Sequence, residues 1–221
     1  MSRVGTLALL AMACLLRGQA PANQGGKAAE SAAGESKGMP PRAAPGEYQS
    51  QGQAGPVTIG AEFTGHSVAT QEATYTTEDY VVVEAGLFGP PQARTKLAIS
   101  DFSLRINGKK ALLPNQPYEL VFKSLKDPEW EPAKKDKSKG SLNAGGGGGE
   151  QEATPEVVHM PLELKRAMEA NVRKAAMPEG DRPLPQAGLL FFEFHGKTQS
   201  IRTLELVYSG AAGTATLRLQ P

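Results

Sequence analysis

Cysteine is almost absent from the sequence, because Cys14 is the only one among 221 residues. Disulfides and cysteine-rich zinc sites each need several cysteines, so neither can hold this fold together, and hydrophobic burial must do so. Histidine is also scarce. His66, His159 and His195 are not spaced like the ligands of a helix or loop metal site, so we expect no metal and no cofactor.

Neither sign of charge is in excess. Lysine and arginine number 24 and aspartate and glutamate 23, so no net field attracts nucleic acid, and we expect no nucleic-acid partner. A long apolar run is missing as well. The run over residues 7–16 is shorter than the roughly 20 residues that span a bilayer as a helix, so a spanning anchor is not predicted.

That run nevertheless has the layout of a secretory signal. Arg3 precedes it, and the small residues Ala20 and Ala22 follow it, ahead of Asn23. The pattern predicts a signal peptide over residues 1–22 and an exported protein, either periplasmic or extracellular.

A second processing outcome would use Cys14. This residue follows Ala11, Met12 and Ala13, which loosely match the lipoprotein box in which the cysteine becomes the lipidated first residue. The usual leucine of that box is Ala11 here. The sequence leaves both outcomes open: lipoprotein anchoring through Cys14, or removal of Cys14 with the signal peptide.

Two stretches contain few large apolar side chains. Residues 23–55 are rich in Gln, Gly, Ala and Pro, which predicts a disordered tether. Residues 124–160 contain a lysine cluster and five consecutive glycines, which predicts a flexible insertion. A helix is predicted to follow over residues 161–177, with Pro161 at its first position and Pro178 after its end.

The remaining sequence, residues 56–221, alternates apolar and polar residues with the period of a strand. About seven short strands are expected, and Asn107-Gly108 should form a tight hairpin turn between two of them. Parallel strands would need helical crossovers between them, and the pattern offers only one helix. It therefore favours a mostly β fold, namely a two-sheet antiparallel sandwich. The expected strands cover residues 57–64, 79–88, 102–106, 118–122, 188–194, 200–208 and 213–219.

This strand pattern resembles a family of secreted immunoglobulin-like domains of unknown function, found in bacterial lipoproteins and in a mycobacterial immunoprotective antigen. The resemblance covers about residues 57–219, without the insertion. It implies an immunoglobulin-like sandwich that contacts other molecules in the cell envelope, and it brings no catalytic residues. The matching residues are Asp101, Phe102, Leu104, Gly108, Lys109, Leu184, Pro185, Gly188, Leu190, Phe192, Leu204, Leu206 and Tyr208.

One short motif suggests a nucleotide site. Gly196, Lys197 and Thr198 match the end of a phosphate-binding loop. Such a loop needs another glycine five positions before Gly196, where this chain has Phe191, and it should open a helix. A strand pattern follows instead, so we interpret the triplet as a hairpin turn and expect no nucleotide partner.

The lysine cluster consists of Lys134, Lys135, Lys137 and Lys139. Such a cluster in a loop can simply be solvated. It can also act as a cationic arm that binds an anionic envelope polymer or phospholipid. In the second case the protein would make peripheral contact with the membrane.

These observations favour an exported, non-enzymatic binding or scaffolding module of the bacterial cell envelope, whose partner is an unknown envelope protein or polymer. No catalytic residues are predicted, because no G-x-S-x-G nucleophile elbow occurs. An envelope enzyme would instead need a deep cavity lined by an acid and a histidine. A carrier of a small apolar ligand would need a void between the sheets, against which the bulky Phe102, Phe191, Phe192 and Phe194 argue.

Overall fold

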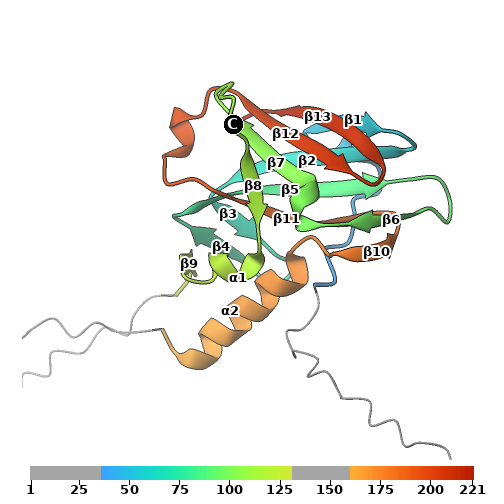
Figure 1. The fold of residues 1–221 in the computed structure, drawn as a ribbon. Coiled ribbons are helices and arrows are strands. Elements are labelled where there is room, and N and C mark those ends of the chain that lie inside the picture. Colours follow the sequence, from blue (N-terminus) through green and yellow to red (C-terminus); the bar gives the residue numbers. More distant parts are fainter. Residues whose placement is uncertain (1–35, 131–159) are drawn as a thin grey trace, which may run out of the picture. The chain divides into compact units, whose positions relative to one another are not determined.

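The alternating apolar residues form the strands of a large antiparallel sheet (Figure 1). A computed structural model describes residues 36–130 and 160–221. Eight strands form the sheet, in the order β1-β2-β5-β11-β8-β7-β12-β13. Their bounds are β1 (Ser50–Ala54), β2 (Val57–Gly65), β5 (Tyr80–Phe88), β7 (Phe102–Ile106), β8 (Leu113–Gln116), β11 (Gln186–Glu193), β12 (Leu204–Gly210) and β13 (Gly213–Leu219).

Short elements flank the large sheet. Strands β3, β4 and β9 form a three-stranded sheet, and β6 pairs with β10. Three single 3-10 turns, η1, η2 and η3, occur in connections. The bounds are β3 (Ser67–Ala69), β4 (Thr74–Thr77), β6 (Arg94–Leu97), β9 (Leu125–Lys126), β10 (Gly180–Pro183), α1 (Tyr118–Val121), α2 (Leu162–Ala175), η1 (Pro45–Glu47), η2 (Ile99–Asp101) and η3 (Thr198–Ser200).

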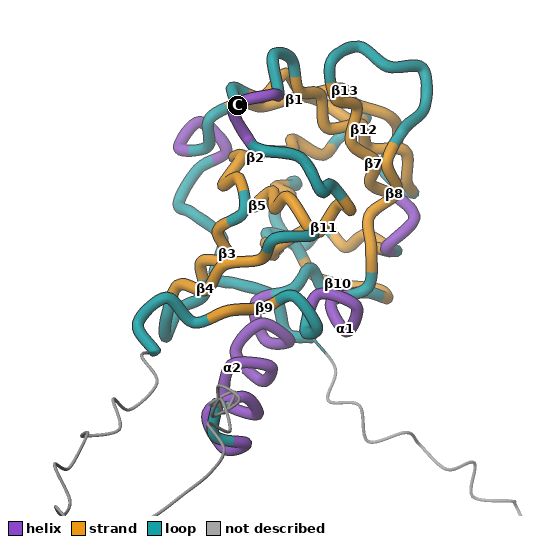
Figure 2. The backbone as a smooth tube through the Cα atoms, turned by 90° about the vertical axis from the view of Figure 1, so that its left-hand side faces the viewer, coloured by secondary structure: helices purple, strands orange, loops and turns teal. Residues whose placement is uncertain are grey.

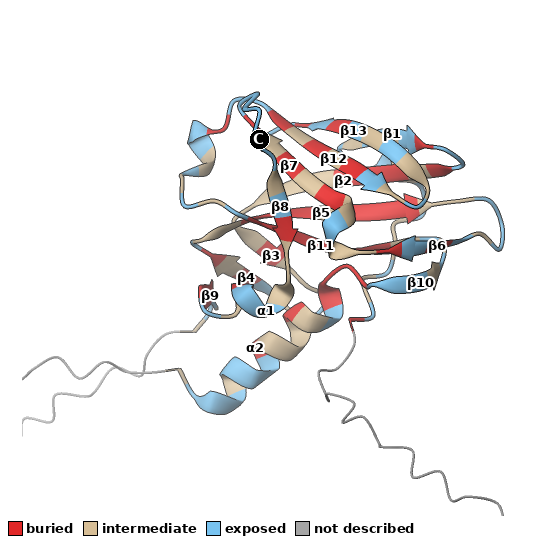
Figure 3. Cartoon of the chain, in the orientation of Figure 1, coloured by how far each residue is buried: buried red, intermediate tan, exposed pale blue. Residues whose placement is uncertain are grey.

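Strands β5 and β11 are buried on both faces, as their continuous apolar sequences predict (Figure 3). On one face, Val83 and Phe192 join a main core that fills the space between the two halves of the large sheet. On the other face, Val82 and Phe191 join an outer core beneath α2. Such double burial is typical of central strands with both faces covered.

Helix α2 covers the outer core where a helix was expected. It buries Met168, Val172 and Ala175, one turn apart, and exposes its other side. The chain leaving the helix runs close to β11, because the backbone N–H of Met177 donates to Leu189 O at 3.0 Å. Gly188 permits this approach, since a Cβ there would lie 2.5 Å from Met177 Cα.

The mostly β, antiparallel class is confirmed, but the hydrogen bonding does not divide the strands into two separate sheets. Strand β8 joins the halves, because it pairs with β11 on one side and with β7 on the other. The sheet also curls until its two edge strands, β1 and β13, lie beside each other (Figure 2). Gln49 exchanges two hydrogen bonds with the backbone of Gln220 across this gap. The result is one nearly closed sheet.

The segment over 118–122 is helical, so the strand predicted there is wrong. Residues Tyr118–Val121 form α1 after Pro117, and the Tyr118 and Phe122 rings lie 5.8 Å apart, as a pair four residues apart on a helix does. Aromatic and β-branched residues favour strands, but here the proline fixes the start of a helical turn and that local geometry prevails.

The tether predicted over 23–55 extends too far. Strand β1 lies inside it and pairs with β2 through five residue pairs. Before β1, residues 36–48 cross the large sheet, and we name them the N-terminal strap. The insertion predicted over 124–160 also begins too early, because the buried Leu125 belongs to β9 and pairs with Thr77 of β4.

The N-terminal strap is fastened to β2 and β5 by Tyr48 and Arg42. Tyr48 is buried over Gly60, where a methyl group would lie 2.5 Å from its ring. The Arg42 guanidinium lies 4.4 Å above the Tyr48 ring and pairs with Glu62 at 2.5 Å and Glu84 at 2.8 Å. These glutamates face each other across β2 and β5, so Arg42 compensates two like charges. The pKa of Arg42 is raised, mainly by its hydrogen bond to Glu84.

Of the two turns predicted from the sequence, only the one at Asn107-Gly108 has the expected backbone angles. Asn107 and Gly108 adopt positive φ angles of 54° and 63°, as the predicted tight turn requires, but β8 begins only at Leu113, so the loop is longer than a tight hairpin. The predicted hairpin at Gly196-Lys197-Thr198 is wrong. Strands β11 and β12 are not neighbours, and the connection between them passes over β8 and β7.

Candidate functional site

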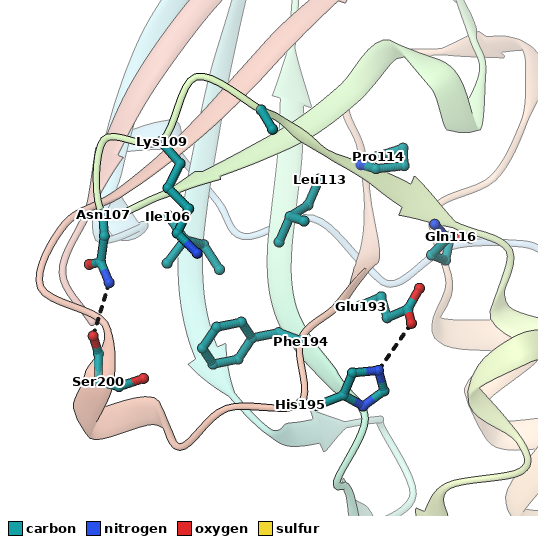
Figure 4. A pocket seen from close by; sticks show the side chains of 11 residues that line it. Ile106, Asn107, Lys109, Leu113, Pro114, Gln116, Glu193, Phe194, His195 and Ser200 are labelled. Carbon is teal, nitrogen blue, oxygen red and sulfur yellow. Dashed lines mark hydrogen bonds and ion pairs between the residues drawn. The ribbon is translucent and has the colours of Figure 1, made fainter.

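A pocket of about 670 Å³ opens at the end of the large sheet where β7 and β11 finish (Figure 4). Two irregular segments flank it: the β7–β8 loop, residues 107–112, and the β11–β12 connection, residues 194–203. The lining residues are Ile106, Asn107, Lys109, Ala111, Leu113, Pro114, Gln116, Glu193, Phe194, His195 and Ser200.

The pocket exists because β8 crosses from one half of the sheet to the other. It pairs with β11 only at Phe191 and Phe192, and with β7 only at Ser103 and Leu104. Beyond these pairs β8 and β11 diverge, so Leu113 no longer has a partner strand on the β11 side. The pocket is the wedge left between the diverging strands.

The floor of the pocket is apolar and continuous with the main core. Ile106 belongs to that core, and Leu113 and Phe194 pack against it while remaining partly exposed. Their side chains point into the space between the two segments in Figure 4. An apolar group bound here would extend the packing of the core and remove the exposed parts of these side chains from water.

Asn107 fixes one side of the pocket. Its amide nitrogen donates to Ser200 O at 3.0 Å, and its amide oxygen accepts from the backbone N–H groups of Arg202 and Thr203. This single side chain therefore ties the β7–β8 loop to the β11–β12 connection. Lys109 lies on the same loop, and it forms no ion pair with residues 36–130 or 160–221. Its ammonium is available to an anionic group in the pocket.

His195 lies on the opposite side, between two carboxylates. Its Nε2 lies 3.0 Å from Glu193 Oε1 and its Nδ1 lies 3.2 Å from Asp79 Oδ1. The hydrogen bond that His195 donates to Glu193, and after it the one to Asp79, raises the pKa of His195 above its ordinary value. The imidazole is thereby favoured in its charged form.

His66 lies below the same connection. Its Nδ1 is 2.7 Å from Tyr80 O, and its Nε2 is 3.1 Å from Gly196 O. The ring stacks on Phe194 at a centroid distance of 6.4 Å. His66 thus contacts both the start of β5 and the connection that flanks the pocket.

The pocket does contain an acid and a histidine, the pair that an envelope enzyme would need. Glu193 and His195, however, have exposed side-chain fractions of 57% and 66%, and they bond to each other at the rim. The only hydroxyl in the lining, that of Ser200, donates to Lys197 O at 2.7 Å. The pocket lining therefore presents no activated nucleophile. Within the described ranges no cluster of three metal-binding side chains occurs.

The residues that the sequence suggested as sites differ from those that line the pocket. Lys134, Lys135, Lys137, Lys139 and Cys14 all lie outside the described residues, as does the predicted signal peptide. The pocket itself was missed. Sequence reasoning assigned Phe194 to a filled core together with Phe102, Phe191 and Phe192, and the other three are indeed fully buried. Phe194 lines the pocket instead, and the polar Glu193 and His195 on either side of it are the sequence signal of a strand that is leaving the core.

Among residues 36–130 and 160–221, no helix has the length and apolar content that a bilayer crossing requires. Comparisons of the chain with protein-family models, with curated proteins and with solved structures found no match.

Proposed function

We propose that the protein is a non-enzymatic binding module of the bacterial cell envelope, and that the pocket beside β8 is its binding site. The observation that carries this proposal is the apolar floor of Ile106, Leu113 and Phe194, open to solvent at the edge of a filled core. An exposed apolar concavity with a few polar groups at its rim is the usual form of a ligand site.

The lining indicates the class of ligand. The floor suits an apolar body of the size of a short acyl chain or an aromatic side chain, and Lys109 suits an anionic or hydrogen-bond-accepting end. The sequence also left open a carrier of a small apolar ligand, and the same apolar floor supports that alternative. In that case the ligand lies at the end of the sheet, because Phe102 and Phe192 are fully buried in the main core that fills the space between its halves.

Binding of the uncharged dye Nile red tests the pocket. We expect its fluorescence to rise on binding to the protein, and the variant Leu113→Gln to weaken binding, because it places an amide on the apolar floor. Leu112→Gln is the matched control, since Leu112 is 39% exposed and does not line the pocket. Equal binding by both variants, or none by the unaltered chain, would refute the proposed site.

The two forms of the proposal can be separated by what is bound to the protein after purification. A carrier should yield an apolar small molecule in stoichiometric amount when the purified protein is extracted with organic solvent and the extract is analysed by mass spectrometry. A module that binds an envelope protein or polymer should yield none, and crosslinking in intact cells should instead attach the β7–β8 loop to that partner.

Export is proposed from Arg3, the apolar run over residues 7–16 and the small residues before Asn23. Expression of the full chain in a bacterium, followed by fractionation and intact mass measurement, tests it. A mature chain that begins at Asn23 supports export with cleavage after Ala22, and a chain that begins at a lipidated Cys14 supports lipoprotein anchoring. Retention of Met1 in the cytoplasmic fraction would contradict export.

A peripheral membrane contact through the lysine cluster is a separate proposal. Binding to anionic lipid vesicles should be strong at low salt, fall steeply as salt rises, and disappear when Lys134, Lys135, Lys137 and Lys139 are all changed to Gln. Absence of binding at low salt would eliminate this contact and leave the lysines as solvated loop residues.

The immunoglobulin-like relationship also stays a proposal. Its support is the main core, to which β2, β5 and β11 contribute from one half of the sheet and β7, β12 and β13 from the other. The halves thus pack face to face as the layers of a sandwich do, although β8 connects them.

A further inference from the structure

Two histidines hold the β11–β12 connection against the start of β5, and both have the same unusual hydrogen bonding. Each ring nitrogen of His66 lies beside a backbone carbonyl oxygen, and each ring nitrogen of His195 lies beside a carboxylate oxygen. The contacts of His66 join segments 130 residues apart in the sequence. All four oxygens act as acceptors.

The number of available donors depends on protonation. A neutral imidazole carries one N–H, and only the imidazolium form carries two. Neutral His66 can therefore donate to Tyr80 O or to Gly196 O, but not to both. The other nitrogen would then face a carbonyl oxygen with its lone pair, which is a repulsive contact. The same count applies to His195 between Glu193 and Asp79.

The charged groups around His195 favour its protonated form. Asp79, before β5, and Glu193, at the end of β11, both face His195, and their charges also raise the pKa of Tyr80, after the larger effect of burial. From the side of β4, Glu78 is engaged by Lys126 of β9 at 2.5 Å. Lys197 in the connection is exposed.

Only part of the connection depends on these bonds. The backbone N–H of Phe194 donates to Asp79 O at 2.8 Å, a bond that does not titrate. At the other end Ile201 is buried, and Arg202 is held by Asn107. Residues 195–200 lie between these fixed ends. Asn107 also holds the backbone oxygen of Ser200, and the bonds from His195 and to Gly196 attach the first part of the segment to the rest of the fold.

We propose that residues 195–200 form a protonation-dependent wall of the pocket. When His66 and His195 are charged, the wall is held in place and the pocket retains its ligand. When they lose their second proton, one bond of each ring is lost, the wall loosens and the ligand dissociates. The wall itself follows from the hydrogen bonds, and the ligand part rests on the proposed function of the pocket.

The wall can be tested without a ligand. In the full chain, ¹⁵N NMR of the imidazoles at about pH 5.5 should show both nitrogens of His66 protonated, because each of them faces an acceptor oxygen. Amide hydrogen exchange over residues 195–200, corrected for intrinsic rates, should be slower at about pH 5.5 than at about pH 8.5. A neutral His66 at the lower pH, or equal protection at both, would overturn the proposal.

Nile red, which does not itself titrate, then tests the effect on binding. We expect its dissociation constant to be about two- to tenfold larger at about pH 8.5 than at about pH 5.5, as the loss of one hydrogen bond predicts. The double variant His66→Phe, His195→Gln keeps a ring on Phe194 and should lose this pH dependence. Lys197→Gln, in the same connection, should keep it.

The outcomes distinguish the two levels of the proposal. If the dye does not bind at either pH but protection over residues 195–200 changes with pH, the proposed function fails and the wall stands. If the dye binds equally at both pH values, the wall does not control the pocket. If the double variant does not fold, the NMR and exchange results on the unaltered chain still decide the matter.

Discussion

The N-terminal strap and the β11–β12 connection are both irregular segments fastened across the large sheet, but they are fastened differently. The strap is held by Arg42, which stays charged at every accessible pH, and by the buried ring of Tyr48. The connection is held by two imidazoles, and Phe194, its first residue, borders an open pocket. From this comparison we expect a segment over a filled surface to contribute more to stability than a segment beside a cavity.

The largest effect is expected at Tyr48. Tyr48→Ala should leave a cavity over Gly60 and lower the free energy of unfolding by about 3–5 kcal/mol, as Phe192→Ala in the main core should. Phe194→Ala should cost only about 1–2 kcal/mol, because that ring is already partly exposed. Urea unfolding followed by circular dichroism measures all three. A loss at Phe194 as large as at Tyr48 would remove the distinction between the segments.

The next effect is expected at Arg42. Arg42→Met leaves Glu62 and Glu84 facing each other without compensation, so the free energy of unfolding should fall by about 2 kcal/mol. Adding Glu84→Gln should restore part of this loss, because it removes one of the like charges. Arg105→Met breaks a more exposed pair with Glu205 and should cost about 1 kcal/mol or less. Equal losses for the two arginines would show that Arg42 contributes no more to stability than a more exposed ion pair does.

A smaller, pH-dependent effect is expected at His195. Its pKa is raised in the folded chain, so its pairing with Glu193 and Asp79 stabilises the fold below the unfolded pKa of about 6.5 and ceases to do so as pH rises through the folded pKa. An NMR titration should show this pKa lowered by Glu193→Gln more than by Asp79→Asn, because Glu193 has the larger effect. No change in either variant would contradict the assignment.

The smallest effect is expected at Lys197. Its side chain is exposed, so Lys197→Ala should change the free energy of unfolding by less than about 0.5 kcal/mol. Because Phe191 replaces the glycine that a phosphate-binding loop needs, calorimetric titration of the unaltered chain with ATP should show no binding. ATP binding that depends on Lys197 would overturn the exclusion of a nucleotide partner.

The strands with strong apolar periodicity were predictable, because burial decided their structure. The alternation of Phe102, Leu104 and Ile106 and the continuous run in β5 gave the correct element and the correct buried faces. Strand β1 gave no such signal. Its sequence, SQGQA, is mostly polar, and it is ordered by pairing with β2, which depends on residues distant from the local pattern.

The pocket could not be predicted, because it depends on where β8 changes partners. His66 and Gly196, or Asn107 and Ser200, become neighbours only when strands far apart in the sequence take their places in the sheet. The spacing of the three histidines gave no pattern to follow, and spacing cannot reveal a contact between an imidazole and a backbone carbonyl. The positive φ angles at Asn107 and Gly108 were predictable because they are a local property, whereas the length of the loop before β8 was not.

The bonds between Gln49 and Gln220 have a consequence for association between copies of the chain. An exposed edge strand is a template on which another chain can add a strand, and this is a common route to aggregation. In the large sheet each edge shields the other, since β1 and β13 lie side by side. Opening that contact would expose two polar, glycine-containing edges at once, so the seam between β1 and β13 is where self-association by strand exchange would begin.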